Sequence, residues 1–346
     1  MLRSMYSGIS GMKVNQTKLD VIGNNIANVS TTAFKGSRAE FKDMLYQNAG
    51  YASNPSTNKG GTNAKQVGLG AQLSSINKMM SQGNATSTGR SLDVCVDGEG
   101  YLIVCSGGAT DSATAEINVT DSAIASATNI SQTAYTRDGN LTLDEHGNLL
   151  TADGMRVMGY AMNNTDFSYA TATSAGVSEG DAVITLTEAI DTQADNAEAD
   201  GTTLVPLSIP YKIIQSSGEE DKVRMFNIGK DGIITATLAS GGRAVIGQIG
   251  MASFKNPEAL QGIGGNLQQD GANTGGAVIK SGLGAASADD NSGGFGDFIQ
   301  GALEASNVDL TEQFTDMIVA TRAFQASSKM ISNGDEILQT ITGLVR

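Results

Sequence analysis

The chain has 346 residues, a formal net charge of −14 and an aromatic content of only 5%. So acidic a chain lacks the basic face that nucleic-acid binding requires, and few aromatic side chains are present to line a large ligand pocket. No stretch approaches the length of a membrane-spanning helix, and the first residues lack the basic and apolar regions of a cleaved signal peptide. We therefore expect no nucleic-acid binding and no membrane insertion, and a chain that stays in the cytoplasm or is exported without a cleaved signal.

The first thirty residues predict an amphipathic helix that ends in a polar turn. Apolar side chains recur at spacings of three and four, so one face of the helix must be buried against a partner. These residues are Met5, Ile9, Met12, Leu19, Ile22 and Ile26. The polar residues at the end of this segment favour caps and turns over helix interiors. They include Asn24, Asn25, Asn28, Ser30, Thr31 and Thr32.

From residue 91 onward the pattern changes to short apolar strands separated by turns. Residues 91–104 predict a hairpin about the turn 97–100, and residues 135–160 repeat this pattern around Asp-Gly and Gly-Asn pairs. Such closely spaced turns are typical of a β-sandwich or barrel. Residues 161–240 are again β-like but more acidic, and we interpret them as a β domain inserted into the first. Residues 46–65 and 262–297 are rich in small polar residues and predict extended connections.

The C-terminal residues are the most regular segment. A stripe with alternating spacings of four and three predicts a helix of about 36 residues, capped by Asp309, with Asn333–Gly334 as the expected bend. Its apolar positions are Leu310, Phe314, Met317, Ile318, Phe324, Ile331, Leu338 and Ile341. Residues 1–44 carry a net charge of +3 and residues 303–346 one of −3, which favours packing of the two ends together. Polar and small residues on both stripes indicate that other chains complete the packing.

No group of residues predicts a catalytic, cofactor or metal site. His146 is the only histidine and lies in an expected turn, so His-dependent catalysis and zinc binding lack their partner residues. Asp138, Asn140 and Asp144 have the spacing of a calcium loop without its glycine and glutamate, and are better explained as turn residues. We interpret Cys95 and Cys105 as two small buried hydrophobic residues.

Both ends of the chain resemble the signatures of the bacterial flagellar axial proteins, the family of rod and hook subunits. In residues 4–41 the matching parts are Ser7–Gly8 and NNIANVSTTAFK, with Ala33 where the family usually has glycine before Phe34. In residues 302–341 they are LEASNVDL and RAFQASSK, with Ser327 in place of the usual asparagine. Residues 87–104 and 135–150 are similar to the β-domain motifs of the family.

This resemblance implies an α+β, mainly β fold in three parts. The terminal helices (1–44 and 298–346) would form a coiled-coil-like polymerisation bundle, which includes the apolar and asparagine residues named above and Phe34. An inner, discontinuous β domain with extended linkers would comprise 45–160 and 241–297, and 161–240 would be an inserted outer β domain. Because some hooks of the family contain cysteine–lysine cross-links between subunits, the resemblance also makes Cys95 or Cys105 a candidate for such a link.

The insertion at 161–240 is similar to the layout of hook subunits, and we therefore expect a hook subunit. Such a subunit self-assembles into a tubular universal joint that transmits torque from rod to filament and encloses the export channel. The implied partners are further copies of the chain, other axial proteins (rod, hook cap and hook–filament junction), and an export chaperone or the type III export apparatus. The implied location is the extracellular hook.

Two alternatives stay open. The first is a distal rod subunit of the same family, which forms a straight and stiff tube instead of a curved one. The second is a secreted adhesin or enzyme whose functional part is residues 161–240, which would then fold alone and bind or convert a ligand.

Overall fold

The computed structural model describes residues 2–55, 57, 59–107, 116–120, 123–162, 165–169, 182–186, 198–214, 219–284 and 294–344. It consists of two compact units, which we call the helical unit (1–81 and 306–346) and the β unit (82–305). Both ends of the chain therefore belong to the helical unit. The three-part division at residues 161 and 240 stays a prediction.

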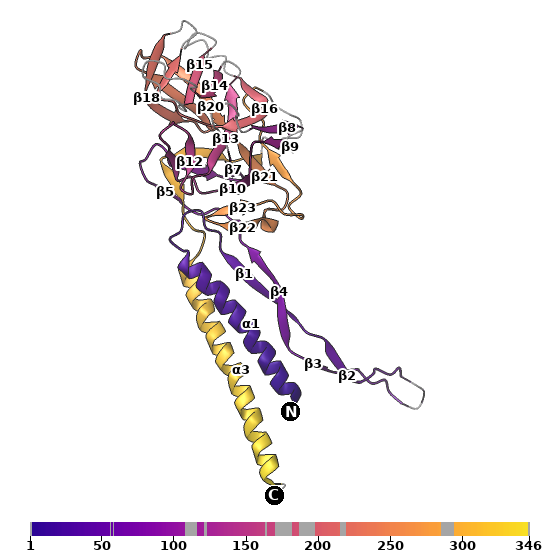
Figure 1. Cartoon of the computed structure of the whole chain (residues 1–346). Helices are drawn as coiled ribbons and strands as arrows, with labels where there is room; N and C mark the ends of the chain where they lie inside the picture. The colour runs from indigo at the N-terminus through magenta and orange to yellow at the C-terminus, as the bar shows by residue number, and fades with distance from the viewer. Residues whose placement is uncertain are drawn as a thin grey trace. The chain divides into compact units, whose positions relative to one another are not determined.

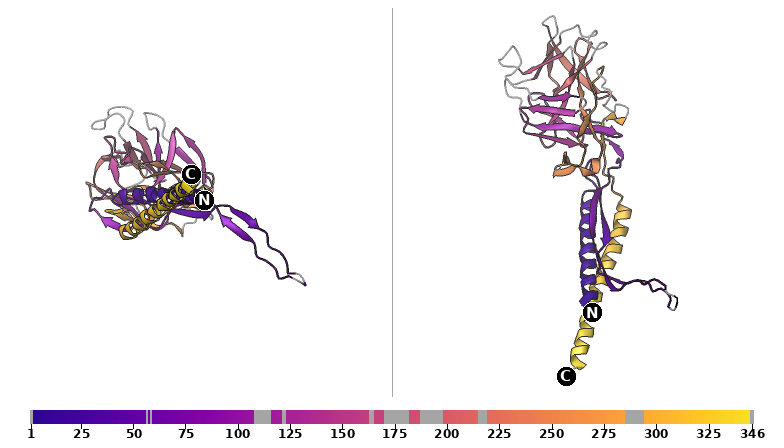
Figure 2. Two further views of the ribbon diagram at one scale, coloured as in Figure 1. Left: turned by 90° about the horizontal axis from the view of Figure 1, so that it is seen from below. Right: turned by 90° about the vertical axis from the view of Figure 1, so that its right-hand side faces the viewer.

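Two antiparallel helices form the centre of the helical unit. α1 (Leu2–Ala27) and α3 (Leu310–Leu344) lie side by side in both views (Figures 1 and 2). The carboxylate of Asp309 accepts a hydrogen bond from the backbone N–H of Thr311 at 2.7 Å, which confirms the predicted cap. α3 has 35 residues and is continuous through Asn333–Gly334, and the expected bend there stays a prediction.

Two strand pairs complete the helical unit. β1 (Ser37–Asp43) pairs with β4 (Ala71–Lys78), and β2 (Tyr46–Gly50) pairs with β3 (Lys65–Gly68), both antiparallel. The segment 46–65 is therefore part of a hairpin, not the extended connection that its composition predicts. Figures 1 and 2 show this hairpin extending away from the two helices of its unit.

Within its described residues, the β unit contains short strands and the 3₁₀ turn η1. In its first half these are β5 (Ala85–Ser87), β6 (Val94–Asp97), β7 (Tyr101–Ser106), β8 (Glu116–Thr120), β9 (Ala123–Thr128), β10 (Gln132–Thr136), β11 (Leu141–Leu143), β12 (Leu149–Thr151), β13 (Arg156–Met162), β14 (Thr165–Tyr169) and β15 (Ala182–Leu186). In its second half they are β16 (Ala199–Pro206), β17 (Lys212–Ile214), β18 (Glu220–Ile228), β19 (Ile233–Leu238), β20 (Arg243–Ile249), β21 (Met251–Phe254), η1 (Pro257–Ala259), β22 (Gln261–Gly264), β23 (Leu267–Gln269), β24 (Ala277–Ile279), β25 (Asp297–Gln300) and β26 (Ala302–Glu304).

The predicted hairpin at 91–104 is wrong in its pairing, although both of its strands exist. β6 pairs with β25, which is 200 residues further along the chain, while β7 pairs with β10, β13 and β21. Gly98 has φ +115°, and a Cβ there would lie 2.9 Å from the Cα of Gly296, so the returning chain passes directly against this turn. A local turn signal identifies the strand ends but not the distant strand that pairs with them.

The other β predictions differ in their outcome. β11 and β12 form an antiparallel hairpin around the turn that contains His146, as the sequence predicts. β13 pairs with β7 and also with β16 and β20, so hydrogen bonding is continuous across residue 161. Residues 262–297, expected as an extended connection, contribute β22, β23 and β24 to the sheet.

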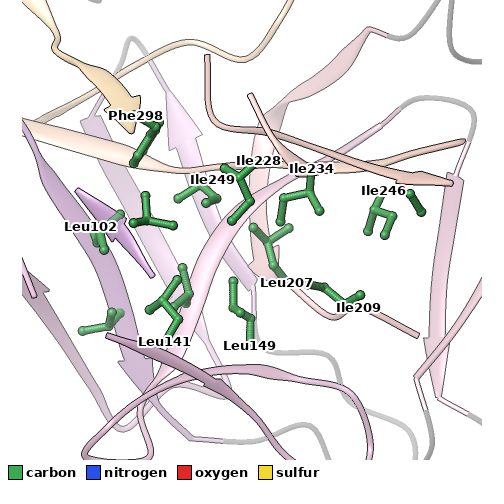
Figure 3. Packing of buried hydrophobic residues seen from close by; sticks show 14 of the residues in the cluster. Leu102, Leu141, Leu149, Leu207, Ile209, Ile228, Ile234, Ile246, Ile249 and Phe298 are labelled. Carbon is green, nitrogen blue, oxygen red and sulfur yellow. The ribbon is translucent and has the colours of Figure 1, made fainter. Parts of the chain in front are cut away.

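The core of the β unit consists of two apolar clusters, one on each face of β7. Leu102 and Val104 belong to the first cluster, whereas Tyr101, Ile103 and Cys105 belong to the second. This is the alternation expected of a strand that is covered on both faces. Figure 3 shows part of the first cluster, in which Leu102, Leu141, Leu149, Leu207, Ile228, Ile249 and Phe298 come together from strands far apart in sequence. The predicted class, mainly β with packed terminal helices, is confirmed.

Candidate assembly surface of the terminal helices

The two helices approach closely because small residues lie where they meet. A Cβ on Gly8 would lie 3.2 Å from Cγ1 of Ile331, and a Cβ on Gly334 would lie 3.1 Å from Cγ of Met5. Gly11 likewise lies against Ser327, and Ala320 of α3 is fully buried. Gly334 is therefore a site of close packing between the two helices.

The positions of α3 that face α1 are 313, 317, 320, 324, 327, 331, 334 and 338. Every second one of these positions is shifted by one residue from the predicted stripe. The apolar members Met317, Phe324, Ile331 and Leu338 belong to both stripes and are half-buried. The other predicted apolar positions, Leu310, Phe314, Ile318 and Ile341, are exposed. The predicted stripe consists mainly of large apolar residues, whereas the two helices meet at Gln313, Ala320, Ser327 and Gly334.

The predicted N-terminal residues also divide between contact and exposure. Ile22 and Asn25 are buried, and Ile9 and Asn24 are exposed. The half-buried residues are Met5, Met12, Leu19, Ile26, Asn28 and Phe34.

Asn25 joins three segments of the helical unit. Its side-chain amide donates to the backbone carbonyl of Ser37 at 2.8 Å and to Oε1 of Gln313 at 3.0 Å, while its Oδ1 accepts from the N–H of Ser37 at 3.0 Å. A buried amide needs such partners to offset its lost hydration. Asn25 therefore ties the end of α1 both to β1 and to α3.

The rest of the asparagine-rich segment forms the turn that the sequence predicts. Asn28 donates to the backbone carbonyl of Asn24 at 2.9 Å and accepts from the Thr31 hydroxyl at 3.2 Å. Ala33 follows with φ +54°, a left-handed conformation that glycine adopts more easily. This conformation explains why the family signature usually has glycine at the position of Ala33.

A second asparagine fixes the return of the chain toward α3. Oδ1 of Asn307 accepts from the N–H of Gly36 at 2.8 Å, and its amide donates to the carbonyl of Met79 at 2.7 Å. Sequence reasoning included Asn307 in the C-terminal signature but gave it no role, because its partners are more than 200 residues away.

One ion pair and many exposed apolar side chains complete this surface. Lys18 and Asp316 lie 3.3 Å apart across α1 and α3, and most of the exposed large apolar side chains of the described chain lie in the helical unit. They include Tyr6, Leu45, Tyr51, Phe314, Ile318, Met330, Ile337 and Leu344. Many exposed large apolar side chains in one unit indicate surface that is available for interaction.

The two cysteines do not support the predicted cross-link between subunits. Both are free thiols that are fully buried in the β unit, and Sγ of Cys105 lies 3.1 Å from Sδ of Met158. Burial raises the pKa of the Cys105 thiol to about 11, which further lowers its reactivity at neutral pH. A cross-link would require this core to open.

The β unit places the other candidate residues in turns. The carboxylate of Asp144 accepts from the N–H groups of His146 and Asn148, and Asp138 accepts from the N–H of Asn140. These contacts are those of Asx turns. Within the described ranges, no three His, Cys, Asp or Glu side chains are grouped as metal ligands would be, and no helix is long and apolar enough to cross a membrane.

The geometry thus defines a structural subunit with an exposed helical surface, and comparison with known proteins identifies its family. Three family models match: "Flagella basal body rod protein" at residues 5–35, "Flagellar hook protein FlgE/F/G D1 domain" at 124–236, and "Flagellar basal body rod FlgEFG protein C-terminal" at 299–344. The basal-body rod protein FlgG of Bacillus subtilis is 38% identical over 346 residues, covering all of both chains. The chain therefore belongs to the bacterial flagellar rod and hook protein family, whose members are structural proteins and not enzymes.

Two relatives from one organism, Borreliella burgdorferi, show a difference in length. Its rod protein FlgG is 28% identical over 348 residues, covering all of both chains. Its hook protein FlgE is also 28% identical, but over 472 residues, covering 99% of this chain and all of the hook protein. Since this chain has 346 residues, the hook protein contains many residues that have no counterpart here.

Proposed function

We propose that the chain is a subunit of the distal flagellar rod, which polymerises with itself and with other axial proteins beyond the cytoplasm. The observation that carries this proposal is length. Full-length alignment with rod relatives needs 346 and 348 positions, whereas the hook relative needs 472. The segment 161–240 was the basis for expecting a hook subunit, but rod relatives of the same overall length accommodate it.

The helical unit supports self-assembly. Its two helices bury one face against each other, and large apolar side chains remain exposed at Phe314, Ile318 and Met330 of α3. Each such side chain gains about 1.5–3 kcal/mol when it is fully removed from water. Copies of the chain that cover these residues would therefore be stabilised.

The hook function is the second candidate, because the D1-domain model that matches 124–236 is common to hook and rod proteins by its description. The adhesin or enzyme alternative loses its support, because the family is structural and the match to the D1-domain model crosses residue 161.

Electron microscopy of polymers formed by the purified chain tests the proposal. We expect straight, stiff tubes, whereas curved tubes would favour the hook and a persistent monomer would exclude both. Phe314→Asp places a charge on exposed apolar surface and is expected to abolish polymers while leaving helix content unchanged. Ser328→Asp introduces the same charge at an exposed polar position of the same helix and serves as the control.

A further inference from the structure

The helical unit contains an open apolar groove between α1 and the segment around β4. Its volume is about 550 Å³, and Tyr6, Ile9, Val14, Met44, Leu69 and Leu73 provide most of its apolar lining. Lys13 is the one charged side chain among the lining residues of this groove. Tyr6 is 66% exposed, so the groove is accessible from solvent.

The α3 helix of the same chain does not occupy this groove. The lining residues of α1 are Tyr6, Ile9, Ser10, Lys13, Val14 and Thr17. At about 100° per residue, most of them lie on the side of α1 opposite Gly8 and Gly11, which lie against side chains of α3. A helix packed on one side of α1 cannot cover the other.

The last turns of α3 have an apolar face that is largely uncovered by the described residues of the helical unit. Gly334 lies against Met5, near the start of α1, so the residues that follow it extend past the end of that helix, as both figures show. Ile337, Ile341 and Leu344 are exposed by 50%, 42% and 81% and have the spacing of one helix face. Residues 330–344 contain Asp335 and Glu336 and no basic residue.

From these two features we propose that the groove binds the end of α3 from a second copy of this chain. Ile337, Ile341 and Leu344 enter the groove, and Glu336, which flanks this face, lies near Lys13. The complementary charges and the matching apolar character select this occupant, in the manner of a helix that binds in a hydrophobic groove.

This contact would build an open assembly. The groove and the helix end are different surfaces of one subunit, so the interface is heterologous and each copy can bind one copy before it and one after it. The inference rests on the proposed self-assembly and specifies one of its contacts.

Disulfide trapping in the full-length chain tests the contact. Leu73→Cys in the groove is combined in turn with Ile337→Cys, Ile341→Cys or Leu344→Cys, which sample successive positions along the helix end. Oxidation is expected to give a ladder of covalent oligomers on non-reducing gels for at least one pair. A variant with one added cysteine can form disulfide-linked dimers at most. The native cysteines are buried and should not contribute to the ladder. Leu73→Cys with Ser328→Cys, exposed on another part of α3, is the matched control and should give no ladder.

Charge exchange supplies a second readout that does not depend on apolar packing. Lys13→Glu alone and Glu336→Lys alone should each lower the yield of the ladder about two- to fivefold, and the double variant should restore it. Circular dichroism verifies that each variant keeps its helices.

Sedimentation of the same samples separates the two proposals. Polymers that sediment without any groove–helix ladder, or with an equal ladder in the Ser328→Cys control, would overturn the docking and leave the self-assembly intact. A chain that stays monomeric in every sample overturns both.

Discussion

The helical unit and the β unit bury apolar surface in different ways. In the β unit, strands from distant parts of the sequence cover both faces of β7, so that Leu102, Ile103 and Val104 are all fully buried. In the helical unit, the helices meet through glycine, alanine and serine, while larger side chains such as Phe314 and Leu344 stay exposed. One unit is complete within a single chain, and the other has apolar surface left for further chains.

Polar contacts differ in the same way. In the β unit, Nε of Arg137 and a carboxylate oxygen of Glu304 lie 2.9 Å apart, and both side chains are buried. In the helical unit, Lys18 and Asp316 form a partly exposed pair. A buried pair is costly to break, whereas an exposed one contributes little. This difference gives the largest expected effect.

Glu304→Ala should destabilise the β unit by about 3–5 kcal/mol. It leaves the Arg137 guanidinium buried without its carboxylate and removes the acceptor for the N–H of Gly83, which lies 2.9 Å from Glu304. Urea unfolding followed by tyrosine fluorescence measures this loss. Asp316→Ala in the exposed pair is the control and should cost less than about 1 kcal/mol. Equal losses in the two variants would contradict the difference between the units.

The buried thiol of Cys105 gives the β unit a dependence on alkaline pH. Its pKa of about 11 in the folded chain lies above the ordinary value of 9.0, so the unfolded chain loses this proton first. The stabilisation is therefore complete below pH 9 and is lost as the pH rises toward 11, by at most about 1.4 kcal/mol per pH unit. Urea unfolding between pH 8 and 11 measures the slope, and Cys105→Val, which has no titrating group, should have the shallower one.

Gly8→Val should destabilise the helix pair by about 1–3 kcal/mol, because the added side chain meets Ile331 and the backbone of Ser327. Gly23→Ala is the matched control in the same helix, since a Cβ there meets nothing within 4 Å. It should stabilise α1 by up to about 1 kcal/mol through helix propensity. Thermal unfolding followed by circular dichroism at 222 nm compares the two. A Gly8→Val variant that is as stable as the parent would show that the helices do not pack this closely.

The sequence predicted those features that local periodicity and composition determine. The extent of α3, its cap at Asp309 and the turn at His146 each depend on residues close together in the chain, and each is confirmed. The pairing of β6 with β25 and the bonds of Asn307 depend on residues about 200 positions away, which no local pattern encodes.

The contact stripe of α3 shows a different limit. The spacing of the large apolar residues predicted the correct helical period. The contact itself contains small residues, because the two helices approach closely at Gly8 and Gly334. Phe324 is half-buried in this stripe, whereas Phe314 is exposed. A stripe predicted from hydrophobicity alone does not distinguish residues that pack within the chain from residues that remain available to a neighbouring subunit.

Ala33→Gly should give the smallest effect, a gain of less than about 1 kcal/mol in the helical unit. Ala33 has φ +54°, a conformation that costs a residue with a Cβ about 1–2 kcal/mol. Glycine removes this strain but loses more conformational entropy on folding, by about 0.4–1 kcal/mol, so the two terms largely cancel. Circular dichroism at 222 nm measures the shift of the helical transition, and the β unit should melt as in the parent chain. A destabilised variant would mean that the Ala33 side chain, which is buried, contributes more through packing than its backbone strain costs.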